Sequence, residues 1–362
     1  MDRKVIVLAG GGTGGHVYPA LSIGDVLRAR GHEVIYYGDP SRLEGRVVEK
    51  RGYALRPVRA LAYPRGGIVG KLRFAVALAD ATWRTSRQLR CDGVALVLGV
   101  GGYISAPTVL GAWMAGIPRV IHEANVSPGL ANKLCARVAN HVLLTFAQTA
   151  ARLPGRAPRE VVGCPVNPKV LAGDRAEALA HYRLDPQKPV LLVVGGSLGA
   201  ATINRLGLDA ARDPARDYQV LHVTGPAYHA EVAAALDPLP PGVVLVDYEH
   251  AMGRAYAAAD LVLCRAGSST LAELTVLGKP SVLVPSPNVT ENHQEANALG
   301  LEQVGAALMI VERDLDLRQA LDRVGRLLRD RQALEVMARA AHDLGRPDTA
   351  ERVADTVERL LP

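Results

Sequence analysis

Short apolar runs alternate with longer amphipathic stretches over most of the chain. The runs at 4–9, 94–100 and 261–264 are mostly apolar, which predicts strands buried on both faces of a sheet. The stretches at 16–30 and 43–51 carry apolar residues at every third or fourth position and predict helices. Strands that alternate with helices indicate a parallel sheet covered by helices, so the expected fold class is α/β.

The same order of elements occurs twice along the sequence. An apolar strand followed by a glycine turn is found at 4–15 and again at 188–200. We therefore predict two doubly wound, Rossmann-like domains that face a cleft. The kinked sequence at 162–169 is the expected linker, which places an N-terminal domain at 1–163 and a C-terminal domain at 164–347.

The end of the chain is predicted to be helical. The last helix is expected to begin at Asp348, with Glu351 completing a capping box. The segment 348–362 is then free to cross back onto the first domain. A further strand is expected at 55–61.

Composition narrows the class of protein. The 362 residues suit two domains, and four scattered cysteines without metal-ligand spacing indicate reduced thiols in a reducing compartment. The N-terminus leads directly into a strand, and no segment has eighteen uninterrupted apolar residues, so we expect a cytosolic protein. The net charge of +6 favours attraction to anionic substrates or an anionic membrane surface. No basic run with interleaved aromatics is present, so no nucleic-acid partner is expected.

The turn at Gly267, Ser268 and Ser269 is the strongest candidate for anion binding. It follows an apolar run and precedes a helical pattern that Gly278 ends. A strand, a small-residue turn and a helix together point free backbone N–H groups and a positive helix end at one spot, which suits a phosphate. Glu273 lies one turn further on, where its carboxylate could reach the hydroxyls of a sugar attached to that phosphate. The alternative is an ordinary βα connection whose small residues serve packing only.

The glycine loop at 10–15 has the same strand–loop–helix arrangement and is a second, weaker candidate for a phosphate cradle. No Gly-Lys-Ser/Thr follows, which excludes a P-loop. His16 comes directly after the loop, at the start of the helix. A histidine beside a positive helix end is suited to act as a general base near neutral pH. The alternative is a histidine that caps or packs.

The segment 65–90 is basic with an apolar face. It contains six cations against the single acid Asp80, and this combination is typical either of a membrane-surface patch or of a solvated helix with a core-facing side. The cations are Arg65, Lys71, Arg73, Arg84, Arg87 and Arg90, and apolar residues such as Ile68, Leu72, Phe74 and Trp83 lie among them.

The chemistry that this arrangement supports is group transfer from an activated phosphate donor. Glycine turns at the carboxyl ends of strands would hold a departing diphosphate with fixed N–H dipoles. The acidic pair Asp314 and Asp316 is expected to begin a solvated helix and not to hold a metal, because no small turn lies beside it. We therefore expect neither a metal nor another cofactor.

Five ordered motifs resemble the MurG family of N-acetylglucosaminyltransferases. They are GGGTGGHVYPAL, GGYISAPTVLGAW with IHEAN, GGSLGAATIN, CRAGSSTLAEL and HQEANA, and they cover nearly the whole chain. The resemblance implies the two-domain GT-B fold, with UDP-N-acetylglucosamine as donor and undecaprenyl-diphospho-N-acetylmuramoyl-pentapeptide (lipid I) as acceptor. It further implies inversion at the anomeric carbon, lipid II as product, and a peripheral location on the cytoplasmic face of the membrane. Cell-wall synthesis proteins are further candidate partners.

The resemblance also assigns roles to residues and domains. The first domain would dock the acceptor and the membrane, and the second would bind the UDP-sugar. The positions that match the family's donor site are Thr13, Gly14, Gly15, Asn125, Ser197, Ser268, Ser269, Thr270, Leu271, Ala272, Glu273 and Gln294. Glu249 matches a backbone contact to the uracil, and Asn167 stands where the family often has an arginine.

The expected mechanism is a single displacement. His16 would take the proton of the acceptor's 4-hydroxyl, with Glu123 as the rival base. The residues expected to dock on the anionic membrane are Ile68, Lys71, Leu72, Arg73, Phe74, Trp113 and Lys133.

Three other functions stay open on the sequence. One is a related enzyme, either a transferase to another lipid or a UDP-N-acetylglucosamine 2-epimerase, which would act on the donor without an acceptor. Another is a sugar-nucleotide-binding subunit without catalysis, disfavoured by the presence of both halves and of His16. The last is a nicotinamide oxidoreductase, disfavoured by the imperfect dinucleotide fingerprint.

Overall fold

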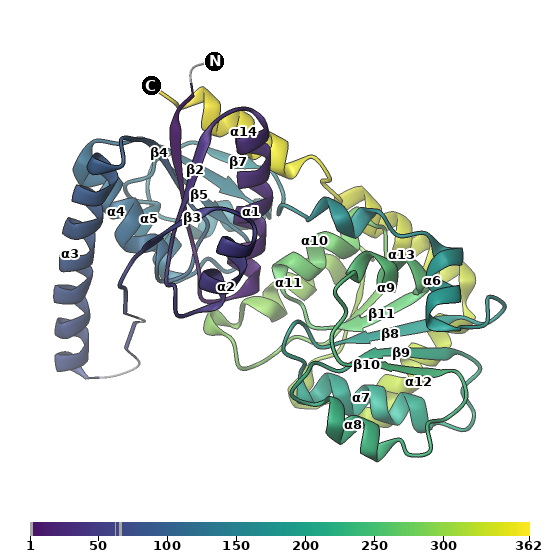
Figure 1. Ribbon diagram of the computed structural model, residues 1–362. Helices are drawn as coiled ribbons and strands as arrows, with labels where there is room; N and C mark the ends of the chain where they lie inside the picture. The colour runs from purple at the N-terminus through teal and green to yellow at the C-terminus, as the bar shows by residue number, and fades with distance from the viewer. Residues whose placement is uncertain (1–2, 62, 65–66) are drawn as a thin grey trace. The chain divides into compact units, whose positions relative to one another are not determined.

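The computed structural model describes residues 3–61, 63–64 and 67–362 and contains two compact units (Figure 1). The first unit is Met1–Val166 together with Arg346–Pro362, and the second is Asn167–Gly345. Each unit is built on one open sheet in which every pairing is parallel, with helices on both faces. The predicted class of two doubly wound α/β domains is confirmed.

The first sheet has seven strands in the order β3-β2-β1-β4-β5-β6-β7. Val7 of the central strand pairs with Ile35 on one side and with Val97 on the other. The strands are β1 Val5–Ala9, β2 Glu33–Gly38, β3 Ala54–Pro57, β4 Val94–Gly99, β5 Arg119–Glu123, β6 His141–Leu144 and β7 Arg159–Val161.

The second sheet has six strands in the order β10-β9-β8-β11-β12-β13. Leu263 pairs with Val193 on one side and with Val282 on the other. The strands are β8 Val190–Val194, β9 Gln219–Val223, β10 Val243–Val246, β11 Leu261–Cys264, β12 Ser281–Leu283 and β13 Leu308–Met309.

Helices connect nearly all of these strands. The first unit contains α1 Gly14–Ala29, α2 Leu43–Lys50, α3 Ile68–Cys91, α4 Ser105–Ala115, α5 Leu130–Cys135, the short 3-10 helix η1 Ala147–Arg152 and α14 Thr349–Arg359. The second contains η2 Pro168–Leu171, α6 Arg175–Tyr182, α7 Ala201–Arg212, α8 His229–Ala235, α9 Met252–Ala258, α10 Ser268–Val276, η3 Thr290–Asn292, α11 His293–Glu302, η4 Glu312–Asp314, α12 Leu317–Arg329 and α13 Arg331–Leu344.

Alternate residues of β1 enter two different hydrophobic layers. Ile6 and Leu8 pack in a cluster with residues of α1 and α14, whereas Val7 and Ala9 pack in a cluster with residues of α3 and α4. This alternation is the period of two that a strand imposes on its side chains. A strand covered on both faces must be apolar throughout, which explains the unbroken run that predicted it.

The last helix, α14, packs within the first unit. Its residues Val353, Ala354 and Val357 are fully buried in the same cluster as α1. The predicted start of this helix is correct, but the predicted capping box is wrong. Asp348 has φ −87° and ψ 12° and makes no side-chain cap, because it lacks the extended conformation that an N-cap side chain needs. The hydroxyl of Thr349, the first residue of the helix, donates one hydrogen that is shared between the carbonyls of Val162 and Arg346.

The strand predicted at 55–61 is shorter than expected. β3 is an edge strand that ends at Pro57, opposite the last residue of β2, Gly38. Beyond Gly38 the neighbouring strand supplies no further hydrogen-bonding partners, so the chain leaves the sheet after Val58 donates to the Gly38 carbonyl.

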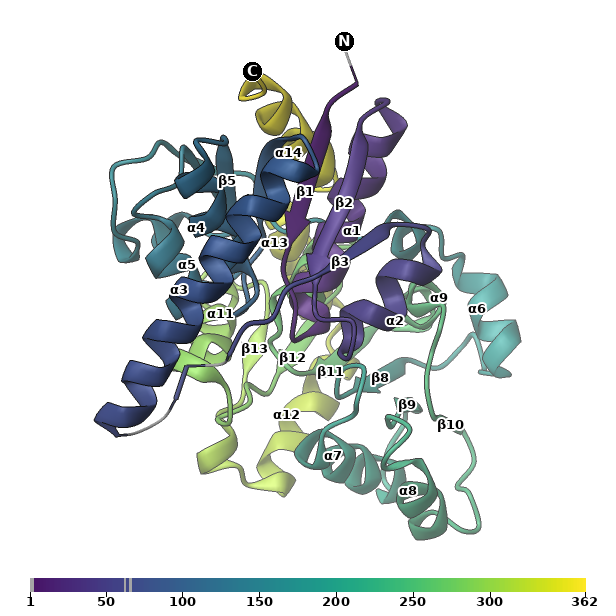
Figure 2. The same ribbon diagram turned by 60° about the vertical axis from the view of Figure 1, so that its left-hand side comes forward.

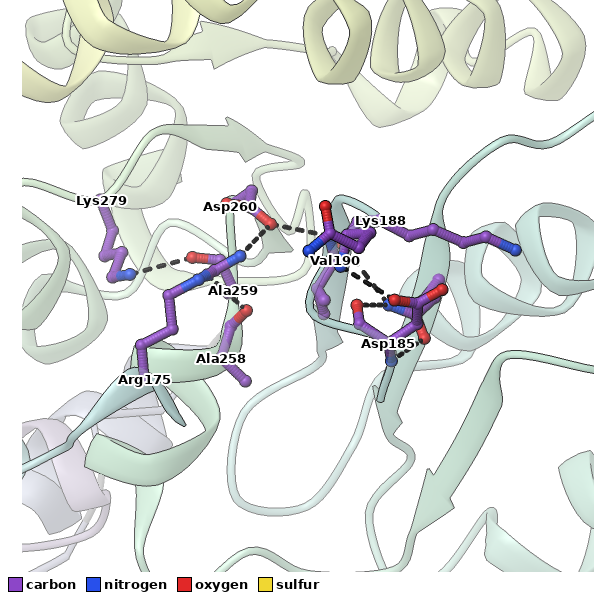
Figure 3. Close-up of polar contacts among 10 residues, drawn as sticks. Arg175, Asp185, Lys188, Val190, Ala258, Ala259, Asp260 and Lys279 are labelled. Carbon is purple, nitrogen blue, oxygen red and sulfur yellow. Dashed lines mark hydrogen bonds and ion pairs between the residues drawn. The ribbon is translucent and has the colours of Figure 1, made fainter. Parts of the chain in front are cut away.

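Polar contacts fasten the amino ends of the strands in the second sheet (Figure 3). The Asp260 carboxylate, just before β11, accepts from Arg175 at 2.9 Å and from the backbone N–H of Val190 at 2.8 Å. Arg175 and Lys279 also donate to the carbonyls of Ala258 and Ala259 at the end of α9. The two cations thus complement the negative end of that helix, which gives them a structural role.

Helix α3 is amphipathic and extends past its neighbours in the first unit. Its first half has no element of the same unit lying over it (Figures 1 and 2), and Ile68 and Leu72 are 86% and 65% exposed. In the described part of the chain, no helix is both long and apolar enough to cross a bilayer.

Candidate active site

The strand order of each sheet reverses at one place, between β1 and β4 in the first unit and between β8 and β11 in the second. In open parallel sheets, ligands bind outside the carboxyl ends of the strands at such a reversal. Four loops leave these ends, at 10–13, 100–104, 195–200 and 265–267. Parts of four of the motifs identified in the sequence lie in these loops.

The glycine loop after β1 already holds a carboxylate of the protein itself. Glu44 of α2 is fully buried, and its Oε2 accepts from the Gly12 N–H at 3.3 Å. A Cβ added to Gly11 would lie 2.3 Å from Glu44 Oε1, so the loop closes tightly around this side chain. Glu44 thus occupies the N–H group of Gly12, and the phosphate cradle expected at 10–15 stays a prediction. Gly14 and Gly15 begin α1, and Thr13 is its N-cap and is exposed.

His16 lies in the first turn of α1 with its ring against the loop that follows β4. A Cβ added to Gly101 would be 3.1 Å from His16 Nδ1 and 3.0 Å from His16 Cε1. Gly101 has φ +96°, in the left-handed region that favours glycine. Both the conformation and the close approach thus require glycine at this position.

Glu123, the last residue of β5, anchors the loop that follows it. Its side chain is 2% exposed, and each carboxylate oxygen accepts twice. Oε1 accepts from the backbone N–H of Asn125 at 2.9 Å and from its side chain at 3.3 Å. Oε2 accepts from Gly129 N–H at 3.1 Å and from Asn132 Nδ2 at 2.9 Å. These four bonds use the acceptor capacity of a carboxylate. They favour a positioning role for Glu123 over its predicted role as the rival base.

Burial raises the pKa of Glu123, and the hydrogen bonds from Asn125, Asn132 and Gly129 oppose that shift without cancelling it. Asn132 links this cluster to the histidine, because its Nδ2 would be 3.4 Å from a Cβ placed on Gly101. The sequence reasoning missed Asn132. The one feature of the sequence that could have identified it is a polar residue on the buried side of a short helix.

The turn after β11 presents donors that the protein does not use. Gly267 is the N-cap of α10 and supplies no side chain to the first turn, so that turn's N–H groups lack a capping partner. Ser269 Oγ is buried and makes no hydrogen bond to the described residues. Five other buried hydroxyls of the described residues also make no hydrogen bond, so it is the position of Ser269 in this turn that makes its hydroxyl a candidate donor to a ligand. Thr270 is half-buried in the same turn.

Two further predicted residues of α10 offer no polar side chain. Leu271 is 2% exposed, and its N–H donates to the Gly267 carbonyl. Ala272 follows it within the helix. Any contribution of these two residues to a ligand is therefore through packing of the turn.

Glu273 lies in the second turn of α10 and is half-buried. Tyr256 of α9 donates its hydroxyl to Glu273 Oε2 at 2.8 Å. Burial raises the pKa of Glu273 to about 7, although the Tyr256 hydrogen bond lowers it. Sequence reasoning identified Glu273 but missed Tyr256, which comes from a separate helix.

The remaining predicted donor-site residues lie on other loops of the second unit. Ser197 is exposed between Gly196 and Gly199, which have φ +90° and +78°. The side-chain oxygen of Gln294 accepts from the Ser286 N–H at 2.9 Å, which leaves its NH₂ group to donate.

Glu249 and Asn167 have side chains engaged elsewhere. Both carboxylate oxygens of Glu249 are used, by the Tyr182 hydroxyl at 2.5 Å and by the Ala251 N–H at 2.6 Å, which fits a contact through backbone atoms only. Asn167 caps η2 by accepting from the Lys169 N–H at 3.1 Å. Asn167 is the first residue of the second unit.

An ion pair that the sequence did not predict ties the loops of the second unit together. Arg265, which follows β11, pairs with Glu312 and donates to the Val284 carbonyl at 3.0 Å. Thr202 at the start of α7 donates to the same Glu312 carboxylate at 2.7 Å. These contacts connect four segments of the second unit. They fix the position of the loop that leads from β11 into α10.

The predicted membrane-docking residues do not form one cluster. Ile68, Lys71, Leu72, Arg73 and Phe74 lie at the start of α3, where Phe74 stacks edge-on against Tyr63. Trp113 lies on α4 and Lys133 on α5. Arg90 donates to the carbonyl of the residue after Trp113, so Trp113 is near the far end of α3, roughly 25 Å along the helix from Leu72. Arg65 lies outside the described residues.

The exposed apolar residues form a stripe along α3 instead. Ile68, Leu72, Val76 and Trp83 follow at spacings of four, four and seven, which places them on one helical face. All four are at least half exposed. Exposed lysine and arginine side chains flank the stripe.

The helix start predicted at the acidic pair, residues 314 and 316, is confirmed. Asp316 is the N-cap of α12 and accepts from the Gln319 N–H at 3.1 Å. Asp314 pairs with its neighbour Arg313. Among the residues that the structure describes, no group of three or more His, Cys, Asp or Glu side chains is arranged to hold a metal ion.

Comparisons with known proteins agree with this architecture. The model of the glycosyltransferase family 28 N-terminal domain matches residues 6–144, and that of the family's C-terminal domain matches residues 190–355. A relative from Salinibacter ruber is 41% identical, with 98% of this chain and 96% of the relative covered. A relative from Clavibacter michiganensis is 42% identical, covering 98% and 95%. Both are named UDP-N-acetylglucosamine--N-acetylmuramyl-(pentapeptide) pyrophosphoryl-undecaprenol N-acetylglucosamine transferase.

A solved structure is similar over its whole length. The crystal structure of Acinetobacter baumannii MurG superposes with a TM-score of 0.80 at 27% identity, covering 98% of this chain and 99% of that one. The fold is therefore GT-B, as the resemblance implied. With matches across both domains and over almost the entire sequence, the chain belongs to glycosyltransferase family 28 and, within it, to the MurG transferases.

Proposed function

We propose that this enzyme transfers N-acetylglucosamine from UDP-N-acetylglucosamine to the 4-hydroxyl of lipid I, which yields lipid II and UDP. The observation that carries the proposal is the open N-terminal turn of α10, at the strand-order reversal of the second sheet, with the buried Ser269 hydroxyl unpartnered. Backbone N–H groups, a hydroxyl and a positive helix end suit a diphosphate. The identities of sugar and acceptor rest on the names of the relatives.

The second unit is proposed to hold the nucleotide. The amides of Ser269 and Thr270 and the Ser269 hydroxyl bind the diphosphate, and Glu273 accepts from the ribose hydroxyls. Ser197 and Gln294 contact the phosphate and the transferred sugar from neighbouring loops, and the backbone near Glu249 contacts the uracil. The charge that develops on the leaving diphosphate meets donors that are already oriented, so little reorganisation opposes the reaction.

The first unit is proposed to supply the base and the acceptor. His16 removes the proton of the 4-hydroxyl as that oxygen attacks the anomeric carbon, and the bond from this carbon to the diphosphate oxygen breaks. The proton ends on the imidazole, and the electron pair leaves with UDP. Because the attack is a single displacement on the face opposite the leaving group, the configuration inverts. Glu123 orients Asn125 and Asn132 around this site, and Asn125 contacts the sugar.

Helix α3 is proposed to dock on the cytoplasmic face of the membrane. Its apolar stripe would enter the headgroup region while flanking cations such as Lys71 and Arg73 attract anionic lipid. A lipid-linked acceptor stays in the bilayer, so an enzyme that uses it gains by binding the same surface.

Replacement of His16 tests the assignment of the base. His16→Ala is expected to lower the transfer of labelled N-acetylglucosamine to a lipid I analogue by about 10²- to 10⁴-fold, because proton removal loses its acceptor. Donor affinity should stay near the wild-type value. Near-normal turnover would remove His16 from the mechanism. Donor consumption by the wild-type enzyme without acceptor would favour the epimerase alternative.

Gly101 offers a test of the histidine's placement with a matched control. Gly101→Ala and Gly116→Ala both put a Cβ at a positive φ, so each is expected to lose about 1–2 kcal/mol of unfolding free energy. Only the methyl at 101 meets His16, whereas nothing lies within 4 Å of the one at 116. Turnover should therefore fall at least about tenfold for Gly101→Ala alone, because a small misplacement of a catalytic group is costly. Equal turnover in the two variants contradicts the placement.

Vesicle binding tests the docking helix. Substitution of both Ile68 and Leu72 by Ser should weaken sedimentation with anionic vesicles at least about tenfold, since each buried aliphatic side chain contributes about 1.5–3 kcal/mol. Leu239→Ser, which alters a 49% exposed leucine of the second unit, is the control and should bind as the wild type does. Wild-type binding that is equal for neutral and anionic vesicles, or unchanged in the double variant, argues against docking through α3.

A further inference from the structure

The contact between Tyr256 and Glu273 joins a buried residue to the proposed ribose site. Tyr256 is only 2% exposed and reaches Glu273 Oε2 from α9 at 2.8 Å. Oε1 of the same carboxylate makes no hydrogen bond to the described residues and is not fully buried. One oxygen is therefore fixed by the protein while the other stays available to a ligand.

No cation balances this carboxylate. Within the described part of the chain no Lys, Arg or His side chain forms an ion pair with Glu273. Besides burial, the group that shifts its pKa is the Tyr256 hydroxyl of α9, and Glu273 in turn contributes to raising the pKa values of Tyr256 and of Cys264 on β11. Burial raises the pKa of the Cys264 thiol to about 12 and that of the Tyr256 hydroxyl well above its usual range, so both stay protonated. The tyrosine hydroxyl is thus the one group seen to stabilise the ionised form.

We propose that Tyr256 is a positioning residue for the sugar nucleotide: its hydroxyl donates to Glu273 Oε2 and favours the carboxylate form, with Oε1 directed to accept hydrogen bonds from the ribose diol. This inference rests on the proposed function, in which Glu273 binds the ribose. A carboxylate accepts from two hydroxyls, whereas a protonated carboxyl group has lost part of that acceptor capacity. The buried tyrosine therefore acts on donor binding without touching the donor.

The proposal makes donor binding depend on pH in a defined direction. Burial raises the pKa of Glu273 to about 7 in the free protein, so near pH 7 about half of the molecules carry a proton there. The ribose hydroxyls stabilise the carboxylate, so donor binding releases this proton, and affinity falls as pH drops below 7. Removal of the Tyr256 hydroxyl removes the hydrogen bond that lowers the pKa of Glu273. The pH at which donor affinity begins to fall should therefore be higher in the variant.

Calorimetry with UDP-N-acetylglucosamine tests this, because its diphosphate does not titrate near neutral pH. Titrations in buffers of different ionisation enthalpy give both Kd and the number of protons released. A hydrogen bond to a charged group shifts a pKa by about one unit or more, so Tyr256→Phe should bind about fivefold more weakly than wild type at pH 7. It should release about 0.9 proton against about 0.5 for wild type, and the two affinities should converge near pH 9.

Two variants serve as controls. Tyr218→Phe removes the hydroxyl of another buried tyrosine in the same unit, before β9, and should follow the wild-type curve. Glu273→Gln should bind the donor weakly and release no proton across this pH range.

The outcomes separate the inference from the function on which it rests. A Tyr256→Phe curve that is parallel to wild type, with the same proton release, overturns the positioning role and leaves Glu273 in place. A Glu273→Gln variant with wild-type affinity and proton release instead removes Glu273 from the donor site, and the positioning role of Tyr256 with it.

Discussion

The rest of the structure depends on the backbone N–H groups at the carboxyl ends of the central strands, which need hydrogen-bond acceptors. Both units have a small-residue loop at the point where strand order reverses, and both loops lead into a helix whose first N–H groups lack partners within the helix. In the first unit the buried Glu44 carboxylate fills the loop. In the second, no side chain caps the turn before α10, and the buried Ser269 Oγ makes no hydrogen bond to any residue that the structure describes. The same strand–loop–helix arrangement thus contacts a buried carboxylate of the protein in one unit, and in the other it is the proposed anion site.

Buried or half-buried glutamates recur in this design, and in the described part of the chain each accepts hydrogen bonds but forms no ion pair. Glu44 contacts the glycine loop after β1, Glu123 anchors the loop after β5, and Glu273 faces the proposed ribose site. A buried carboxylate must be satisfied by hydrogen bonds or it destabilises the fold, so each fixes the backbone or side chains around it. Glu123 has four donors and is saturated, whereas Glu273 has one and retains capacity for a ligand. The number of donors therefore distinguishes a structural carboxylate from one suited to binding.

Much of the fold and part of the site could be predicted from the sequence. Fully buried strands must be apolar and helices must be amphipathic, so strands such as β1 and β11 and the turn at Ser268 were visible as local patterns. Partners distant in sequence were not. Glu44 lies 32 residues from Gly12, Tyr256 lies 17 from Glu273, and Arg265 lies 47 from Glu312. No local spacing encodes such pairs, because tertiary folding alone brings them together. The membrane patch shows the same difference. The basic and apolar composition of segment 65–90 indicated a candidate docking segment, but which apolar residues of α3 are exposed on one face could be seen only in the structure.

The most direct test is a crystal structure of the enzyme with UDP. If the open turn of the second unit is the anion site, the diphosphate oxygens lie within hydrogen-bond reach of the backbone N–H groups of Ser269 and Thr270 and of the Ser269 hydroxyl. A diphosphate bound at the loop that Glu44 fills, or at the amino ends of the strands beside Arg175 and Lys279, contradicts the account.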